Sequence, residues 1–177
     1  MDSKEFKIRR ATMVDILALQ KMAKATFYES FIDITPEADM QEYLEAAFST
    51  EALLAELQDQ DSIFYFIENG VQLMGYGKIN FNKVPYGFSE MPNSMEIQRI
   101  YIKKEFQQCG AAGKLMHVFF EEARKRKLHN IWLSTGSLNN KALSFYSKYG
   151  FETIGHHEFP VGGEMFDDLI LLLNKSQ

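Results

Sequence analysis

The sequence is poor in cysteine and has no long hydrophobic run. Its one cysteine, Cys109, cannot form a disulfide within the chain, and such sparse cysteine usage is typical of the reducing cytoplasm. The charged N-terminal residues lack the apolar segment of a signal peptide, and no apolar stretch reaches the ~18 residues that span a bilayer. These absences predict a cytoplasmic protein with no membrane partner.

The chain also lacks an excess of positive charge. Its formal net charge is −5 at pH 7, whereas nucleic-acid binding needs a basic face that contacts phosphates. The basic run from Arg124 to Lys127 falls at the expected end of a helix, where positive charge suits the helix dipole. The four histidines show no metal-ligand spacing with cysteine or carboxylates. We therefore expect no nucleic acid and no metal, while a cationic small substrate is compatible with the charge.

Apolar and aromatic side chains are abundant. Hydrophobic residues make up 46% of the 177 residues and charged residues 24%, and there are 15 Phe and 8 Tyr. This composition is ordinary for a globular protein, and the length suffices for one domain with a substantial core. Because we find no internal repeat and no low-complexity linker, we expect a single domain over residues 1–177.

Hydrophobic periodicity predicts a succession of strands and helices. Strands are expected at residues 6–10, 62–68, 71–81, 95–102, 130–134, 151–159 and 165–173. Helices are expected at about residues 12–30, 36–47, 50–57, from a glycine-rich turn to about 127, and 139–149. This order indicates an α/β (α+β) fold built around one central mixed sheet.

Local signals mark the ends of several elements. Thr12 fits the capping position of the first helix, Pro36 the first position of the second, and Thr50 the cap of the third. Asn69-Gly70 predicts a hairpin turn, and Val161-Gly162-Gly163 predicts another between the last two strands.

A glycine-rich turn, which we call the glycine loop (residues 107–113), connects the expected strand at 95–102 to the following helix. Its sequence is Gln107-Gln108-Cys109-Gly110-Ala111-Ala112-Gly113. Such a turn points backbone N–H groups at whatever lies over the helix N-terminus, which favours an anion such as a pyrophosphate. Taken alone, it also fits an ordinary connection between a strand and a helix.

A second segment, about 30 residues further on, reads Asn139-x-x-Ala142-x-x-Phe145-Tyr146-x-x-x-Gly150-Phe151. Together with Gln107-x-x-Gly110-x-Ala112, it resembles the signature of the GNAT superfamily of acetyl-CoA-dependent N-acetyltransferases. The order of elements resembles that fold over essentially the whole chain. The resemblance implies a GNAT-like acyl-CoA N-acyltransferase fold, with a mixed, mostly antiparallel central sheet flanked by helices.

Shorter motifs resemble the PaiA-type acetyltransferases within this superfamily. They are Ile8-Arg9-x-Ala11-Thr12, Thr26-Phe27-Tyr28-Glu29-Ser30-Phe31, Glu96-Ile97-x-Arg99-Ile100-Tyr101-Ile102, Ile131-Trp132-Leu133 and Asp168-Leu169-Ile170. That group is associated with acetylation of the polyamines spermidine and spermine. The resemblance therefore implies a small cationic amine as the acceptor.

The resemblance also implies how acetyl-CoA would be bound. Backbone amides of the glycine loop would hold the pyrophosphate of coenzyme A, and the strand before the loop would pair with the pantetheine arm. Asn139 would hydrogen-bond the cofactor, and Lys148 would reach its phosphates. The cofactor-binding residues so assigned are Ile100, Tyr101, Ile102, Gln107, Gln108, Cys109, Gly110, Ala111, Ala112, Gly113, Lys114, Asn139 and Lys148.

Tyr146 matches the family's general acid. It follows Asn139 by two helical turns, so both residues face the same side of the expected helix. A phenol of pKa ~10 can protonate a leaving thiolate whose acid has a pKa of ~8.5 when the two are in contact. The alternative is that Tyr146 is an aromatic residue packed beneath the sheet.

The acceptor amine must lose a proton before it attacks. An amine of pKa ~10.4 is neutral only about one time in 2,500 at pH 7, so a general base would help. Glu96 is the first candidate and Glu29 the second. Gln98 shares the strand face of Glu96 and cannot take a proton, which makes a relay through water another option.

Aromatic and acidic residues are interleaved at Phe27, Tyr28, Glu29 and Phe31. They would wall a site for a cationic chain through cation–π contacts and carboxylates, or belong in part to the core.

The function we expect is direct transfer of an acetyl group from acetyl-CoA to a primary amine of a small cationic substrate such as spermidine. Alternatives are a regulatory protein that binds acyl-CoA with little turnover, or an acetyltransferase for an amino acid, an antibiotic amine or a protein N-terminus. A homodimer is compatible with the family, although no residue demands it.

Overall fold

Residues 6–70, 72–161 and 164–174 are described in the computed structural model of the chain. The strands are β1 Phe6–Arg10, β2 Ser62–Asn69, β3 Gln72–Phe81, β4 Ser94–Ile102, β5 Asn130–Gly136, β6 Glu152–Val161 and β7 Glu164–Asn174. The helices are α1 Ile16–Phe31, α2 Glu37–Ala47, α3 Thr50–Gln58, α4 Ala111–Lys125 and α5 Asn140–Ser147, with short 3-10 turns η1 Met13–Asp15 and η2 Lys104–Phe106.

The strands form one seven-stranded sheet in the order β1-β2-β3-β4-β5-β7-β6. Neighbouring strands are antiparallel except β4 and β5, which are parallel. The parallel ladder joins only Ser94–Glu96 to Asn130–Trp132, although β4 continues to Ile102 and β5 to Gly136. We call the region beyond this ladder, where both strands run on unpaired with each other, the β4–β5 fork.

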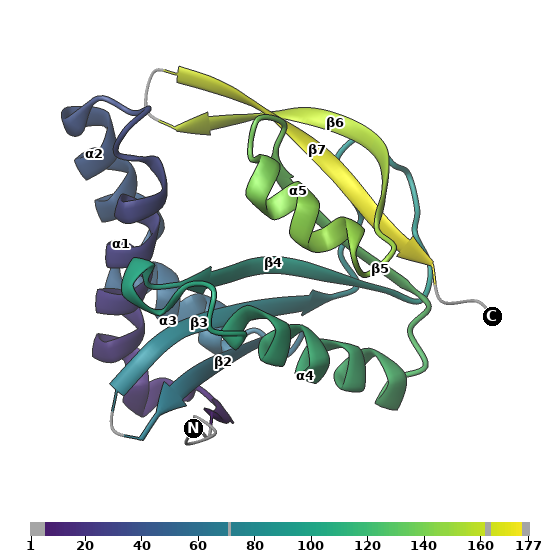
Figure 1. The fold of residues 1–177 in the computed structure, drawn as a ribbon, viewed down its shortest axis with the longest axis horizontal. Coiled ribbons are helices and arrows are strands. Elements are labelled where there is room, and N and C mark those ends of the chain that lie inside the picture. Colours follow the sequence, from purple (N-terminus) through teal and green to yellow (C-terminus); the bar gives the residue numbers. More distant parts are fainter. Residues whose placement is uncertain (1–5, 71, 162–163, 175–177) are drawn as a thin grey trace.

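Helices cover both faces of the sheet (Figure 1). Along β2, Tyr65 and Ile67 belong to the core on the α4 side, while Phe64 and Phe66 belong to the core under α1, α2 and α3. Because side chains alternate across a strand, a continuous apolar run is what a strand covered on both faces requires. We call the two sides of the sheet the α4 face and the α1 face.

A charged network is enclosed on the α1 face. Glu56 of α3 accepts two hydrogen bonds from the Arg99 guanidinium, at 2.6 and 3.0 Å, and lies 3.0 Å from the Lys78 ammonium. The Lys78 side chain is only 5% exposed and that of Glu56 25%. Burial raises the pKa of Glu56, but the hydrogen bonds and charges of Arg99 and Lys78 outweigh this effect and lower the pKa overall.

The predicted elements are confirmed, with small differences at their ends. Pro36 precedes α2 as its N-cap. The cap of α3 is Ser49, whose hydroxyl accepts from the Ala52 N–H at 3.1 Å, and the predicted cap Thr50 is the first helical residue. Asn69 ends β2 before Gly70, which has φ 63°, so the hairpin is confirmed. Residues 162–163 of the other predicted turn lie outside the described residues.

Candidate active site

Beyond Glu96, the backbone of β4 has no strand partner within the described residues on the side that faces the fork. The Lys103 N–H donates to the Met74 carbonyl of β3 at 2.9 Å, and antiparallel pairing alternates along a strand. The backbone groups of Ile100 and Ile102 therefore point away from β3, toward the fork. This exposed edge can accept the amides of an extended ligand as an added strand would.

The glycine loop ends in the N-terminus of α4. Gly110 is the N-cap with φ 90°, and Gln108 has φ 63°, so the chain reverses sharply before the helix. Among the described residues, none accepts a hydrogen bond from the N–H groups of Gln108, Cys109 or Gly110. The first N–H groups of α4, from Ala111 onward, also have no partner within the helix. This concentration of free donors fits a phosphate group.

A chain of side chains crosses the fork at the glycine loop. The Gln107 side-chain amide donates to the Ile102 carbonyl at 3.1 Å, and the Lys141 ammonium of α5 donates to the Gln107 side-chain oxygen. Lys148 lies at the other end of α5, seven residues and about 10 Å further along the helix. The structure thus brings Lys141, which sequence reasoning missed, to the loop for which Lys148 was predicted.

Asn139 caps α5. Its side-chain oxygen accepts from the Ala142 N–H at 3.1 Å, which leaves its side-chain N–H groups available to a ligand. Asn139 is exposed, and its Cβ is 3.9 Å from where a Cβ on Gly136 would stand, at the end of β5. The other predicted loop residues Ala112, Gly113 and Lys114 occupy the first turn of α4.

Tyr146 combines a buried ring with a reachable hydroxyl. The residue is 6% exposed, and its ring packs edge-on against Phe145 and Phe151. The Tyr146 hydroxyl has no hydrogen-bond partner among the described residues. It is also not one of the fully enclosed atoms that lack a partner, which belong to Thr35 and Tyr76, so it reaches solvent. Burial raises the pKa of Tyr146, and the nearby Tyr101 hydroxyl of β4 raises it further. The phenol therefore stays protonated at neutral pH and can donate that proton to an acceptor that touches it.

Glu96 lies on the α1 face and is the last residue of β4 that pairs with β5. The Asn80 side-chain amide donates to the Glu96 carboxylate at 2.6 Å and to the Gln98 side-chain oxygen at 3.1 Å. Burial raises the pKa of Glu96, while the bond from Asn80 and the charge of Lys78 oppose that rise. Glu96 is thus a carboxylate of increased basicity, held in a fixed orientation where the fork begins.

The second candidate base, Glu29, lies at the other end of β4. Its carboxylate accepts from the Lys104 N–H at 3.0 Å, just beyond the strand. Six residues of extended chain separate Glu96 from Ile102, about 20 Å. Glu29 therefore joins α1 to the segment before the glycine loop, and the two carboxylates cannot act on the same atom.

The predicted acceptor residues of α1 divide between core and surface. Phe27 is 3% exposed and stacks on Phe31 and Tyr43, with ring centroids 4.4 and 4.6 Å apart. Phe31 is only partly buried against the same core. The Tyr28 hydroxyl donates to Glu37 at 3.1 Å, on the side of α1 next to α2. Phe27 thus lies behind Phe31, Tyr43 and Tyr101, which we call the aromatic wall.

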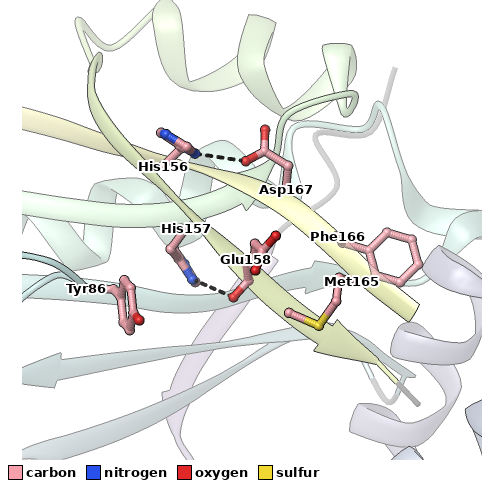
Figure 2. Close-up of a pocket in the computed structure, with 7 residues that line it drawn as sticks. All are labelled: Tyr86, His156, His157, Glu158, Met165, Phe166 and Asp167. Carbon is pink, nitrogen blue, oxygen red and sulfur yellow. Dashed lines mark hydrogen bonds and ion pairs between the residues drawn. The ribbon is translucent and has the colours of Figure 1, made fainter. Parts of the chain in front are cut away.

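A hollow of about 450 Å³ lies beside the β6–β7 hairpin, lined by Tyr86, His156, His157, Glu158, Met165, Phe166 and Asp167. Figure 2 shows His156 and Asp167 on one side of the hairpin and His157 on the other, next to Tyr86. The His157 Nε2 is 3.0 Å from the Ser134 hydroxyl of β5. The sequence spacing does not predict the contact between His157 and Ser134, because the two residues lie on strands that are far apart along the chain.

Within the described residues, no group of three or more His, Cys, Asp or Glu side chains is arranged to hold a metal ion. No helix among the described residues has the length and apolar character needed to cross a membrane.

The sequence profile described as the acetyltransferase (GNAT) family matches residues 24–151. The chain is 29% identical over 166 residues to an uncharacterized N-acetyltransferase of Lactobacillus delbrueckii subsp. lactis, covering 93% of this chain and 95% of that protein.

Two solved structures share the fold. The PaiA N-acetyltransferase of Thermoplasma acidophilum in complex with coenzyme A gives a TM-score of 0.77 at 20% identity, covering 96% of this chain and 99% of that one. The ribosomal-protein-S18-alanine N-acetyltransferase of Escherichia coli gives 0.72 at 14% identity, covering 98% and 96%. At these identities the likeness establishes the fold and leaves the acceptor open.

Proposed function

Because the chain belongs to the GNAT acetyltransferase family, whose enzymes use acetyl-CoA, we propose that it acetylates a primary amine of a small cationic substrate, such as the polyamine spermidine. In this proposal Tyr146 is the general acid and Glu96 the general base, and the amine attacks directly without an acyl-enzyme. Residues 1–177 act as one catalytic domain in the cytoplasm.

The observation that carries the proposal is the β4–β5 fork, which ends at the glycine loop. The loop N–H groups and the first turn of α4 would hold the pyrophosphate of coenzyme A, and the backbone of Ile100 together with the Ile102 N–H would hold its pantetheine arm. Asn139 and Lys141 would contact the cofactor from α5. Acetyl-CoA supplies the acetyl group as a thioester with a thiol leaving group.

Tyr146 is suited to give a proton to the leaving sulfur. Its raised pKa keeps the hydroxyl protonated at neutral pH, and no described residue competes for that proton. Because the conjugate acid of the thiolate has a pKa of ~8.5, below that of the phenol, the transfer requires the two groups to touch as the carbon–sulfur bond breaks.

Glu96 is suited to accept the proton of the amine. An amine of pKa ~10.4 is neutral only about one time in 2,500 at pH 7, so its deprotonation costs about 4.6 kcal/mol. The Asn80 amide fixes the Glu96 carboxylate, and burial makes it more basic than an exposed glutamate. Where the amine does not touch Glu96 directly, a water molecule relays the proton.

Two features support a cationic acceptor. The chain carries a net charge of −5, and the α1 face beside the fork carries Glu96 where the fork begins and the aromatic residues Phe31, Tyr43 and Tyr101 toward the other end of β4. Such a wall attracts a protonated alkylamine through carboxylate and cation–π contacts. The likeness to PaiA-type acetyltransferases supports the same class of acceptor.

The test is release of coenzyme A from acetyl-CoA by the purified protein, followed with a thiol-reactive chromophore. The acceptor panel contains spermidine, spermine, a monoamine, an amino acid, an aminoglycoside and a peptide with a free N-terminal alanine. Cys109 reacts at most once per chain, so a reaction without acceptor corrects for it.

We expect the highest kcat/KM with the polyamines. Turnover of the peptide alone would instead favour a protein N-terminus as acceptor, the activity named for the Escherichia coli neighbour. Tight binding of coenzyme A without turnover of any amine would favour a regulatory acyl-CoA-binding protein.

A further inference from the structure

Asp168 of β7 lies where the fork meets the C-terminal half of the sheet. It pairs with Gly136, the last residue of β5, on one side and with His157 of β6 on the other. An Asp168 carboxylate oxygen is 3.8 Å from where a Cβ on Gly136 would stand. Because Gly136 has no side chain, the carboxylate overhangs the end of β5 rather than being covered by it.

This carboxylate lacks a hydrogen-bond partner within the described residues. Among the described residues, none donates a hydrogen bond to Asp168 or forms an ion pair with it, although it is half-buried. The nearest cationic candidate, His157, is engaged elsewhere: its Nδ1 donates to the Glu158 carbonyl at 3.2 Å and its Nε2 meets the Ser134 hydroxyl at 3.0 Å. The Asp168 oxygens are not among the enclosed side-chain atoms without a partner, so they reach solvent, and a cationic ligand would bind them there in place of water.

Asp168 lies on the same face of the sheet as the aromatic wall. Its charge acts on the Tyr101 hydroxyl, and Tyr101 in turn packs near Phe27 on the α1 face. Phe166, two residues earlier on the same face of β7, packs on that core as well. The neighbouring Asp167 points to the opposite face, where it pairs with His156 at 3.2 Å (Figure 2).

Asp168 and Glu96 are too far apart to hold one nitrogen atom. Glu96 pairs with Trp132 and Asp168 with Gly136, four residues further along β5 and on its other side. These rows are about 13 Å apart along the strands, and two strand spacings add about 10 Å across them. The two carboxylates therefore suit two different nitrogens of one acceptor.

We propose that Asp168 binds a second, non-reacting ammonium group of the acceptor and thereby makes the enzyme prefer diamines and polyamines to monoamines. This inference rests on the proposed function, in which Glu96 serves the nitrogen that reacts. Aromatic side chains, including Tyr101 of the aromatic wall and Phe166, would contact the methylene chain between the two nitrogens.

The test compares kcat/KM for spermidine with that for butylamine in the wild type and in Asp168→Asn, Asp168→Glu and Asp167→Asn. The wild-type preference for spermidine should fall at least tenfold in Asp168→Asn through a higher KM, with kcat little changed. Asp168→Glu should restore part of the preference, and Asp167→Asn should keep all of it. Calorimetry of spermidine binding to the complex with coenzyme A should follow the same order.

An unchanged preference in Asp168→Asn, or an equal loss in Asp167→Asn, would overturn the role of Asp168 while leaving amine acetylation intact. If no variant or wild type acetylates an amine, the proposed function fails. Weaker spermidine binding by Asp168→Asn alone would then still support Asp168 as the ammonium site, and equal binding by all four proteins would refute it.

Discussion

Replacing Tyr146 with phenylalanine removes one oxygen atom from α5 and keeps the ring. The ring contacts with Phe145 and Phe151, at centroid distances of 5.2 and 5.7 Å, persist in the variant. The lost hydroxyl had no hydrogen-bond partner among the described residues, so the free energy of unfolding should change by less than about 1 kcal/mol. The substitution therefore tests the contribution of the hydroxyl proton to catalysis separately from the packing of the ring.

The expected loss is in kcat. A positioned general acid contributes roughly 10²- to 10⁴-fold, which corresponds to about 2.7–5.4 kcal/mol in the activation barrier. We expect Tyr146→Phe to lower kcat at least ~100-fold while the Kd for coenzyme A stays at the wild-type value. Because burial raises the pKa of Tyr146, deprotonation of this residue should not reduce wild-type kcat up to about pH 10, the ordinary pKa of tyrosine.

Tyr149→Phe is the matched control, because Tyr149 lies one turn further along the chain and packs its ring on Phe120 and Phe145. This variant should keep the wild-type kcat, and its Kd for coenzyme A is measured as well because the Tyr149 hydroxyl lies against Gly113 of the glycine loop. The assays are steady-state kinetics of thiol release, calorimetry with coenzyme A, and thermal unfolding. If Tyr146→Phe keeps more than about a third of kcat, less than 1 kcal/mol of barrier is lost and Tyr146 is not the general acid.

Four further substitutions test the base, the phosphate site and the enclosed charges. Glu96→Gln should lower kcat about 100-fold and abolish the loss of rate that the wild type shows as pH falls through the raised pKa of Glu96; an unchanged pH profile would exclude it as the base. Lys141→Ala should weaken coenzyme A binding about tenfold in calorimetry, and Lys148→Ala should not; the reverse order would assign the phosphates to Lys148. Glu56→Gln leaves Lys78 buried without its counter-charge and should destabilise the fold by about 3 kcal/mol in urea unfolding. Because the folded pKa of Glu56 is lowered, its stabilisation is present above about pH 4.3 and lost as pH falls through the lower folded value, so variant and wild type should converge in acid.

Elements with a clear periodicity could be predicted from the sequence. The alternation of Tyr65 and Ile67 with Phe64 and Phe66 identifies a strand buried on both faces, whatever its partners. Ends of helices were less certain where two capping residues adjoin: Ser49 and Thr50 are both good caps, and only the backbone geometry selects Ser49.

The site could be predicted only where its residues share a segment. The glycine loop and the stretch from Asn139 to Tyr146 each lie on consecutive residues, so their spacing carries the signal. Asp168 and His157 come together across β7 and β6, and the sheet order that places them beside the fork depends on long-range pairing. That pairing has no local signature in the chain.

The short ladder between β4 and β5 has a thermodynamic consequence. Within the described residues, the ladder between Ser94–Glu96 and Asn130–Trp132 is the shortest in the sheet, and it joins the N-terminal strands to the C-terminal ones. A cofactor that hydrogen-bonds to Ile100 on one side and to α5 on the other would bridge these two parts of the sheet and stabilise their association. A free cofactor concentration of 100 times Kd would add about 2.7 kcal/mol to the free energy of unfolding. The amide protons along the fork should therefore exchange more slowly as the cofactor concentration rises.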